Sequence, residues 1–439
     1  MRDYVLTAFI FATIPFILMR PWIGALVWTW IGLMNPHRLT WDFAFTMPFA
    51  LVVAIATFIG MFFSREKLRI PWTPSVVLLL LLVAWVSLTT WFAIDPVLAR
   101  VQWEKVMKIE LMTFVTLMLI TDRQRLLALV AVAALSLGFY GVKGGIFTAM
   151  SGGGSQVLGP EGSFIEGNTE IGLAMIMALP LIRVVQLNVQ GRLLRFALGA
   201  SMVLTGLAIL GTQSRGAILG AGAMALMLLL KSRQKLLLLL ALVAVIPALL
   251  FLMPTSWYER MDTIGSYDQD RSAMDRIYAW EFATRMAMNR SLGGGFESFT
   301  PENYAIYLPE RPEAVNEQGA VADAHSIYFQ MLGHHGFVGL ALFLALLATI
   351  WRSARKVLRE TRGRDDLRWA NDIAAMTQVS LVGYMVAGAF LGLAYFDLFY
   401  TLAAIVVINQ SLVARELAPA KADLSARKRQ AERPEPTPL

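Results

Sequence analysis

Two arginines and one histidine are the residues of this chain best suited to chemistry: Arg215, Arg276 and His325. A guanidinium group binds phosphate oxygens through paired hydrogen bonds and keeps its charge, so two arginines suit a pyrophosphate. An imidazole can accept a proton from a hydroxyl group at neutral pH. Together these side chains could hold a pyrophosphate leaving group and activate a hydroxyl nucleophile.

Each of the three also has a simpler explanation. An arginine near a membrane surface can contact lipid phosphates or pair with acids such as Glu259, Asp262 or Asp275. A histidine where a helix starts is often a capping or interfacial residue. The local sequence favours a role for Arg215, because "TQSRGAILG" places it at the start of a Gly- and Ala-rich helix that neighbours can approach closely.

The composition indicates the class of protein that must position these residues. The chain has 439 residues, of which 57% are hydrophobic and 16% are charged. Its apolar residues form blocks of about 18 to 25 residues, the length of a membrane helix. We therefore predict an all-α polytopic integral membrane protein of about 12 transmembrane helices.

Cysteine, histidine and net charge exclude several functions. The chain has no cysteine, which excludes disulfides, thiolate nucleophiles and sulfur-ligated metals, and its four histidines are too few for a convincing zinc site. The formal charge of +7 does not indicate nucleic-acid binding, because the basic residues cluster in short loops between apolar blocks. We expect no metal and no cofactor.

Thirteen apolar blocks can be placed, some too short to be certain crossings. They lie at 5–19, 21–34, 46–63, 75–94, 107–121, 125–149, 170–190, 193–211, 215–230, 234–252, 326–351, 371–393 and 396–414. This divides the chain into N-terminal membrane helices (1–252), a large periplasmic loop (253–325), C-terminal membrane helices (326–414) and a disordered cytoplasmic tail (415–439). We expect the large periplasmic loop to lie between the last-but-two and last-but-one transmembrane helices.

Lysine and arginine in the short loops predict the orientation, since such loops are usually cytoplasmic. Parity then places 253–325 and "NPHRLTW" outside, with Arg215 in an external turn. The N-terminus is either external or cytoplasmic. We prefer the cytoplasmic alternative, with a re-entrant or broken helix around Arg20 and Pro21.

Within the long loop, "RSAMDRIYAWEFATRMAMN" (271–289) predicts an amphipathic helix that carries Arg276 and Arg285. His334 and His335 lie on other faces of the helix that follows His325, so we expect them to pack or to form interhelical hydrogen bonds. Asp268 and Asp270 match the metal-binding DxD pattern, but such a match is weak in an acidic loop. Lys105, Lys143, His37 and Arg38 lie near the external side without a spacing that assigns them a role.

Four motifs in order resemble the bacterial O-antigen ligase and polymerase superfamily: "TQSRGA", "RIYAW", "LGGGFESF" and "HSIYFQMLGHHGFVG", over residues 212 to 340. The N-terminal "RPWIGALVWTWIGLMNPHRLTW" and "GPEGSFIEGN" resemble the branch of O-glycosylation ligases associated with exosortase systems. One departure is His334, where many relatives carry an acidic residue. Any role of that carboxylate cannot be transferred to this chain.

The resemblance implies a GT-C-like glycosyltransferase in the bacterial inner membrane with its active site facing the periplasm. The donor would be a glycan on undecaprenyl pyrophosphate, the acceptor a sugar hydroxyl of lipid A-core, and the product lipopolysaccharide. His325 would be the general base, and Arg215 and Arg276 the pyrophosphate ligands, in a metal-independent, inverting reaction. These are the residues that the chemistry alone singles out.

Other functions share these residues. An O-antigen polymerase or a protein O-oligosaccharyltransferase would use the same donor with another acceptor. A transporter of lipid-linked glycans would predict internal repeats and paired charges at mid-membrane, and neither is clear in the sequence.

Overall fold

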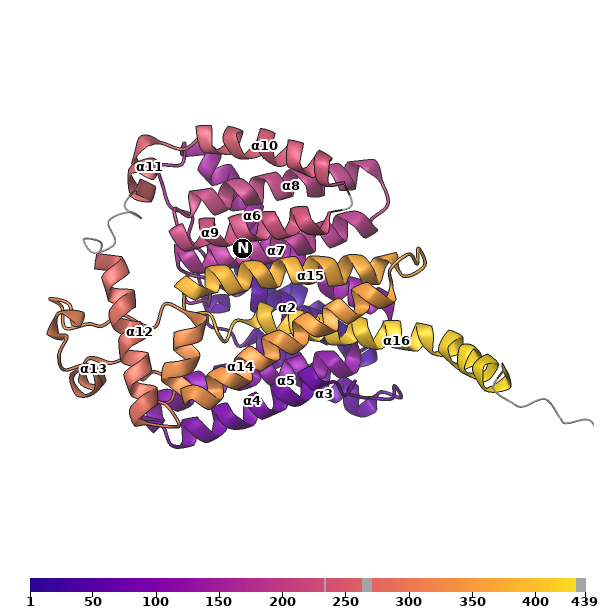
Figure 1. Ribbon diagram of the computed structural model, residues 1–439, viewed down its shortest axis with the longest axis horizontal. Helices are drawn as coiled ribbons and strands as arrows, with labels where there is room; N and C mark the ends of the chain where they lie inside the picture. Colours follow the sequence, from indigo (N-terminus) through magenta and orange to yellow (C-terminus); the bar gives the residue numbers. More distant parts are fainter. Residues whose placement is uncertain (233, 263–270, 432–439) are drawn as a thin grey trace, which may run out of the picture.

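The computed structural model describes residues 1–439 except 233, 263–270 and 432–439, and its described part consists of helices and loops without a strand (Figure 1). Every predicted apolar block coincides with a helix. These helices are α1 (Arg2–Met19), α2 (Trp22–Met34), α3 (Phe49–Phe63), α4 (Pro74–Trp91), α5 (Pro96–Leu119), α6 (Arg123–Met150), α7 (Asn168–Asn188), α8 (Arg192–Gly211), α9 (Arg215–Lys231), α10 (Lys235–Phe251), α14 (Ile327–Glu360), α15 (Arg368–Ala387) and α16 (Asp397–Ala431).

Eight of the described helices are long and apolar enough to cross a membrane: α1, α4, α6, α7, α8, α14, α15 and α16. The apolar helices α2, α3 and α10 are shorter. Because water is absent from the bilayer core, such apolar runs satisfy their backbone groups as helices. The chain is therefore an α-helical membrane protein.

Local sequence explains where several helices begin. The side chain of Asp95 accepts hydrogen bonds from the backbone N–H groups of Val97 and Leu98 and is followed by Pro96, which suits a first helical position. Asp122 caps α6 through the N–H of Arg125. Ser214 caps α9 through the N–H of Ala217, which places Arg215 at the first position of that helix.

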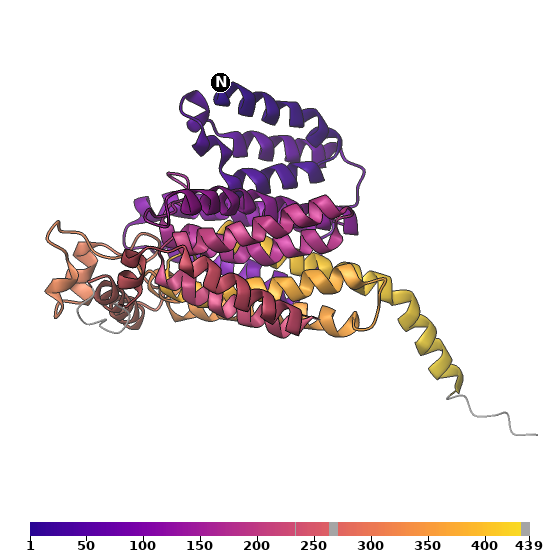
Figure 2. The ribbon, with the colours of Figure 1, turned by 90° about the horizontal axis from the view of Figure 1, so that it is seen from above.

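The first three helices correct our preferred topology for the N-terminus. Arg20 and Pro21 end α1 and start α2 as separate helices, and α1, α2 and α3 pack side by side at the edge of the bundle (Figure 2). The carboxylate of Asp3 accepts hydrogen bonds from the backbone N–H groups of Asp42 (3.1 Å) and Ala44 (3.3 Å). The N-terminus thus lies at the same end of the bundle as "NPHRLTW", whereas our preferred topology places the two on opposite sides of the membrane.

Close packing explains why these short apolar blocks form complete helices. A Cβ on Gly60 would lie 2.7 Å from the carbonyl oxygen of Ile17, so α3 and α1 approach more closely there than a side chain would permit. Small residues at such crossings allow backbones to come together in membrane proteins. Sequence length alone could not reveal this packing.

The long connection between α10 and α14 contains α11 (Thr255–Asp262), α12 (Arg271–Asn289) and α13 (Pro301–Tyr307). Figure 1 places these helices at one end of the bundle, which we call the loop end. The predicted amphipathic helix 271–289 is confirmed as α12. Three long helices follow the loop, so it precedes the last-but-two helix, and our placement after that helix is wrong.

The end of α16 differs from the irregular tail that we predicted from residue 415. The helix continues to Ala431. The segment is rich in Ala, Leu, Glu, Lys and Arg, which have high helix propensity. At the centre of the bundle, α7 and α15 are the most enclosed membrane helices together with α16, whereas α1 is largely exposed.

Candidate functional site

The first part of the candidate site is the start of α9, which neighbouring loops hold in place. Gln213 donates its side-chain amide to the carbonyl of Gly153 (2.9 Å), and Asn168 donates to the carbonyl of Thr212 (2.9 Å). The hydroxyl of Ser214 lies 3.2 Å from that of Thr169. The half-buried Arg215 therefore projects from a fixed helix N-terminus, where N–H groups and the helix dipole favour anions.

The second part is the junction between α12 and the start of α14. The indole N–H of Trp280 donates to the carbonyl of Ala324 (2.9 Å), directly before His325. The same ring stacks on Phe329, with the ring centroids 5.0 Å apart. Arg276 lies one helical turn before Trp280, so α12 holds Arg276 and His325 at the same junction.

A short 3-10 helix, η5 (Gly388–Phe390), connects these two parts. A Cβ on Gly388 would lie 2.8 Å from the side chain of Ile327, the first residue of α14. A Cβ on Gly216, next to Arg215, would lie 3.1 Å from Phe390. Thus η5 packs against both the start of α9 and the start of α14, and Arg215, Arg276 and His325 lie on elements that meet at the loop end.

Helix α14 is broken at Gly336, whose backbone has φ 66° and ψ −171°. The loop after α12 fills the break: the N–H groups of Gly294 and Gly295 donate to the carbonyls of Gly333 and His334 (both 2.8 Å). The indole of Trp85 donates to the carbonyl of His335 (2.9 Å). All three donors satisfy backbone carbonyls in the broken turn, and the bonds from Gly294 and Gly295 attach the loop after α12 to α14.

His334 and His335 lie inside the protein, away from the junction that holds His325. His334 is 5% exposed and its Nδ1 lies 3.1 Å from the hydroxyl of Tyr395. His335 is fully buried and its Nδ1 lies 2.6 Å from the hydroxyl of Thr89. The expectation that these two histidines pack or form interhelical hydrogen bonds is confirmed: His335 contacts Thr89 of α4, and His334 packs inside the protein beside the turn before α16.

The cations of α12 differ in their surroundings. Arg285 forms ion pairs with Glu281 (2.6 Å) and Glu310 (2.5 Å). These neighbouring acids explain why Arg285 lies in the long loop instead of in one of the short, basic loops that we predict to be cytoplasmic. The Asp268–Asp270 motif lies outside the described residues, so the structure does not describe its surroundings.

Two family models match parts of the chain, and one of them spans Arg215, Arg276 and His325. Residues 200–344 match the family model described as O-Antigen ligase. We call residues 200–344 the O-antigen ligase region, after the family model that they match. Residues 1–191 match a model described as Family of unknown function (DUF5935). A comparison with curated proteins finds no match. The exosortase-associated branch stays a prediction.

The O-antigen ligase region contains all three predicted site residues, and it also contains strained backbone. Gln213, Glu297 and His325 have φ angles of 53°, 56° and 41°. Residues other than glycine rarely adopt such angles, and they persist where the surrounding structure imposes them, often at functional sites. Gln213 lies two residues before Arg215, and His325 is the predicted base itself.

Glu297 and Asp323 are acids that our sequence analysis missed in the O-antigen ligase region. Partial burial and the negative charge of Asp323 raise the pKa of Glu297, and the charge of Lys105 counteracts this rise. Asp323 is two residues before His325, and it accepts a hydrogen bond from the N–H of Ala324 (2.7 Å). Carboxylates in this position could accept hydrogen bonds from sugar hydroxyl groups. The motif "LGGGFESF" was the available signal for Glu297.

Proposed function

We propose that this protein is an O-antigen ligase that transfers a glycan en bloc from undecaprenyl pyrophosphate to a sugar hydroxyl of lipid A-core. The observation that carries the proposal is the match of residues 200–344 to the O-antigen ligase model. That region supplies the elements on which Arg215, Arg276 and His325 lie. The proposed product is lipopolysaccharide, formed on the periplasmic face of the bacterial inner membrane.

In this reaction His325 accepts the proton of the acceptor hydroxyl as its oxygen attacks the anomeric carbon. The bond between that carbon and the pyrophosphate oxygen breaks, and undecaprenyl pyrophosphate leaves. Attack opposite the leaving group inverts the anomeric centre. Arg215 and Arg276 stabilise the negative charge that develops on the pyrophosphate, which is the role of fixed cations in transition-state stabilisation.

The surroundings of the three side chains support these roles. The N-terminus of α9 adds backbone N–H groups and a favourable dipole beside Arg215. The Trp280–Ala324 hydrogen bond and the Trp280–Phe329 stack fix the segment that contains His325. Positioning of this kind is a major part of catalysis, because reacting groups must be aligned before the reaction.

The test is glycan transfer by full-length protein purified in detergent, with lipid A-core, an undecaprenyl-pyrophosphate-linked glycan and EDTA present. We expect wild type to form a laddered lipopolysaccharide product, and His325→Ala to form none. Arg285→Gln is the matched control, because Arg285 also lies on α12 but pairs with neighbouring acids.

The other outcomes distinguish the alternatives. Full activity of folded His325→Ala would exclude His325 as the base. If folded wild type lengthens the lipid-linked glycan instead, the protein is a polymerase, and transfer to a protein acceptor would identify an O-oligosaccharyltransferase. Loss of the product when EDTA is added would contradict the metal-independent scheme.

A further inference from the structure

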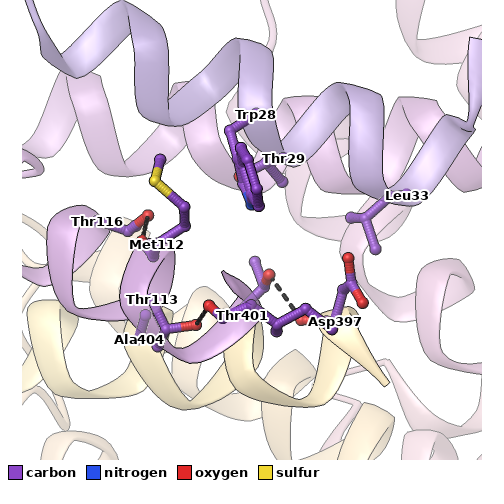
Figure 3. Close-up of a pocket in the computed structure, with 10 residues that line it drawn as sticks. Trp28, Thr29, Leu33, Met112, Thr113, Thr116, Asp397, Thr401 and Ala404 are labelled. Carbon is purple, nitrogen blue, oxygen red and sulfur yellow. Dashed lines mark hydrogen bonds between the residues drawn. The ribbon is translucent and has the colours of Figure 1, made fainter. Parts of the chain in front are cut away.

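A small cavity between α2, α5 and the start of α16 contains a carboxylate that the proposed reaction does not use. The cavity has a volume of about 20 Å³, and its polar lining comprises Asp397 and the threonines Thr29, Thr113, Thr116 and Thr401. A volume of about this size holds one occupant as large as a water molecule. Figure 3 shows Trp28 facing Thr113 and Thr401 across the cavity, with Asp397 at one end beside Leu33.

The threonine hydroxyls of this cavity can accept further hydrogen bonds but cannot donate them. Each hydroxyl already donates its proton to a backbone carbonyl one turn earlier on its own helix. The donor–acceptor distances are 2.8 Å for Thr29 to Ala25, 2.9 Å for Thr113 to Ile109, 2.8 Å for Thr116 to Met112 and 2.9 Å for Thr401 to Asp397. The remaining lone pairs on these oxygens can coordinate a cation or accept another hydrogen bond.

Two buried carboxylate oxygens lack a hydrogen-bond partner: Oδ1 of Asp397, which lines the cavity, and Oε2 of Glu110, which is not among the lining residues. Glu110 is only 3% exposed and lies one turn before Thr113 on the same side of α5. The two carboxylates are close enough to interact electrostatically. Asp397 starts α16, where the helix dipole favours a negative charge, but Glu110 lies in mid-helix without that benefit.

An ionisable side chain inside a membrane protein is costly unless it has a partner, and it usually marks a functional site. We propose that Asp397 and the threonine hydroxyls form a binding site for a monovalent cation, with Na⁺ as the ion that fits best, and that the neighbouring charge of Glu110 strengthens its binding. Hard cations prefer oxygen ligands. Mg²⁺ retains several waters and Ca²⁺ takes six to eight ligands, so a cavity for one small occupant lined mainly by neutral hydroxyls suits neither.

A cation in this site would join the start of α16 to α2 and α5. The turn just before α16 contacts α14: the N–H of Ala394 donates to the side chain of Gln330 (3.1 Å), and the hydroxyl of Tyr395 lies 3.1 Å from His334. The cation would therefore stabilise the part of the bundle against which the helix after His325 packs. The site does not depend on the proposed ligase reaction.

The test measures the thermal unfolding of the full-length protein in detergent by tryptophan fluorescence, as NaCl replaces choline chloride at constant ionic strength. A ligand that binds only the folded state raises the unfolding temperature with its concentration. We expect the unfolding temperature of wild type to rise with Na⁺ and to level off. Glu110→Gln should require at least tenfold more Na⁺ for the same rise.

The control is Glu104→Gln on the same helix, because Glu104 pairs with Arg100 at the surface (3.3 Å). Its response to Na⁺ should equal that of wild type. Thr113→Val preserves the shape of the side chain and should weaken the response as well, so the test remains possible if Glu110→Gln does not fold.

Direct binding of ²²Na⁺ to wild type provides a second measurement. Excess NaCl should displace the label, and choline chloride should not. Equal unfolding temperatures in NaCl and choline chloride, with no displaceable label, would overturn the proposal. A stability that depends on pH alone would show that the carboxylates hold protons and water instead of a cation.

Discussion

Replacement of Gly293 by alanine should break the contact between the loop after α12 and the broken turn of α14. Gly293 has φ 70°, and a Cβ there would lie 2.6 Å from both the nitrogen of Gly336 and the carbonyl oxygen of His334. These are backbone atoms of a packed helix, so they cannot move aside as a flexible side chain would. The loop must shift away from α14.

The magnitude follows from two contributions. A left-handed backbone costs a residue other than glycine about 1 to 2 kcal/mol. The shift also weakens the hydrogen bonds from Gly294 and Gly295 to α14, each of which contributes about 1 kcal/mol. We therefore expect Gly293→Ala to lower the free energy of unfolding by about 3 kcal/mol.

Gly319→Ala is the matched control. Gly319 has φ 75°, but a Cβ there would meet nothing within 4 Å, so this variant measures the backbone cost alone, about 1 kcal/mol. Unfolding of both variants would be followed by tryptophan fluorescence in the same detergent, with glycan transfer measured in parallel. Equal losses of stability would refute the close contact between the loop and α14.

Three further outcomes test the candidate site and its surroundings. Trp280→Phe keeps the ring beside Phe329 but removes the hydrogen bond to Ala324. Stability should fall by about 1 kcal/mol and transfer by roughly ten- to a hundredfold; unchanged transfer would show that this bond does not position His325. Arg285→Gln should leave the stability nearly unchanged, because its ion pairs are partly exposed, and loss of transfer would instead indicate contact with substrate. Burial and the charge of Arg38 lower the pKa of His37 to about 4. Below about pH 6.5 the unfolded state therefore binds more protons than the folded state, and the free energy of unfolding decreases as the pH is lowered. Between pH 7 and 5, His37→Gln should lose about 2 kcal/mol less than wild type in denaturant unfolding; equal losses would contradict the assignment.

Much of the fold could be predicted from the sequence because an apolar run in a membrane has few options. Helices satisfy the backbone within the segment itself, so each apolar block became a helix. The bounds were less predictable: α5 begins eleven residues before its block, and α14 and α16 end nine and seventeen residues after theirs. Local chemistry was equally readable: the Ser214 cap starts α9 at Arg215, and the pattern of 271–289 is that of the amphipathic helix α12.

The sequence was less informative where the outcome depends on partners from elsewhere in the chain. The apolar run after His325 predicts one continuous helix, but the loop at Gly293–Gly295 supplies donors that allow α14 to break at Gly336. The short first two blocks led us to prefer a re-entrant or broken helix there, and the close approach of α3 to α1 at Gly60 is a contact that the length of these blocks does not reveal.

By itself, the sequence determined the residue types for the chemistry, the helices that carry them and the apolar character that places them in a membrane. These properties depend on side chains close together along the chain. Only the tertiary structure decided that η5 connects the starts of α9 and α14, that Glu297 and Asp323 lie near each other, and that Glu110 and Asp397 are close enough to interact electrostatically. Such pairs arise from packing between distant segments, and no local pattern records which helix faces will meet.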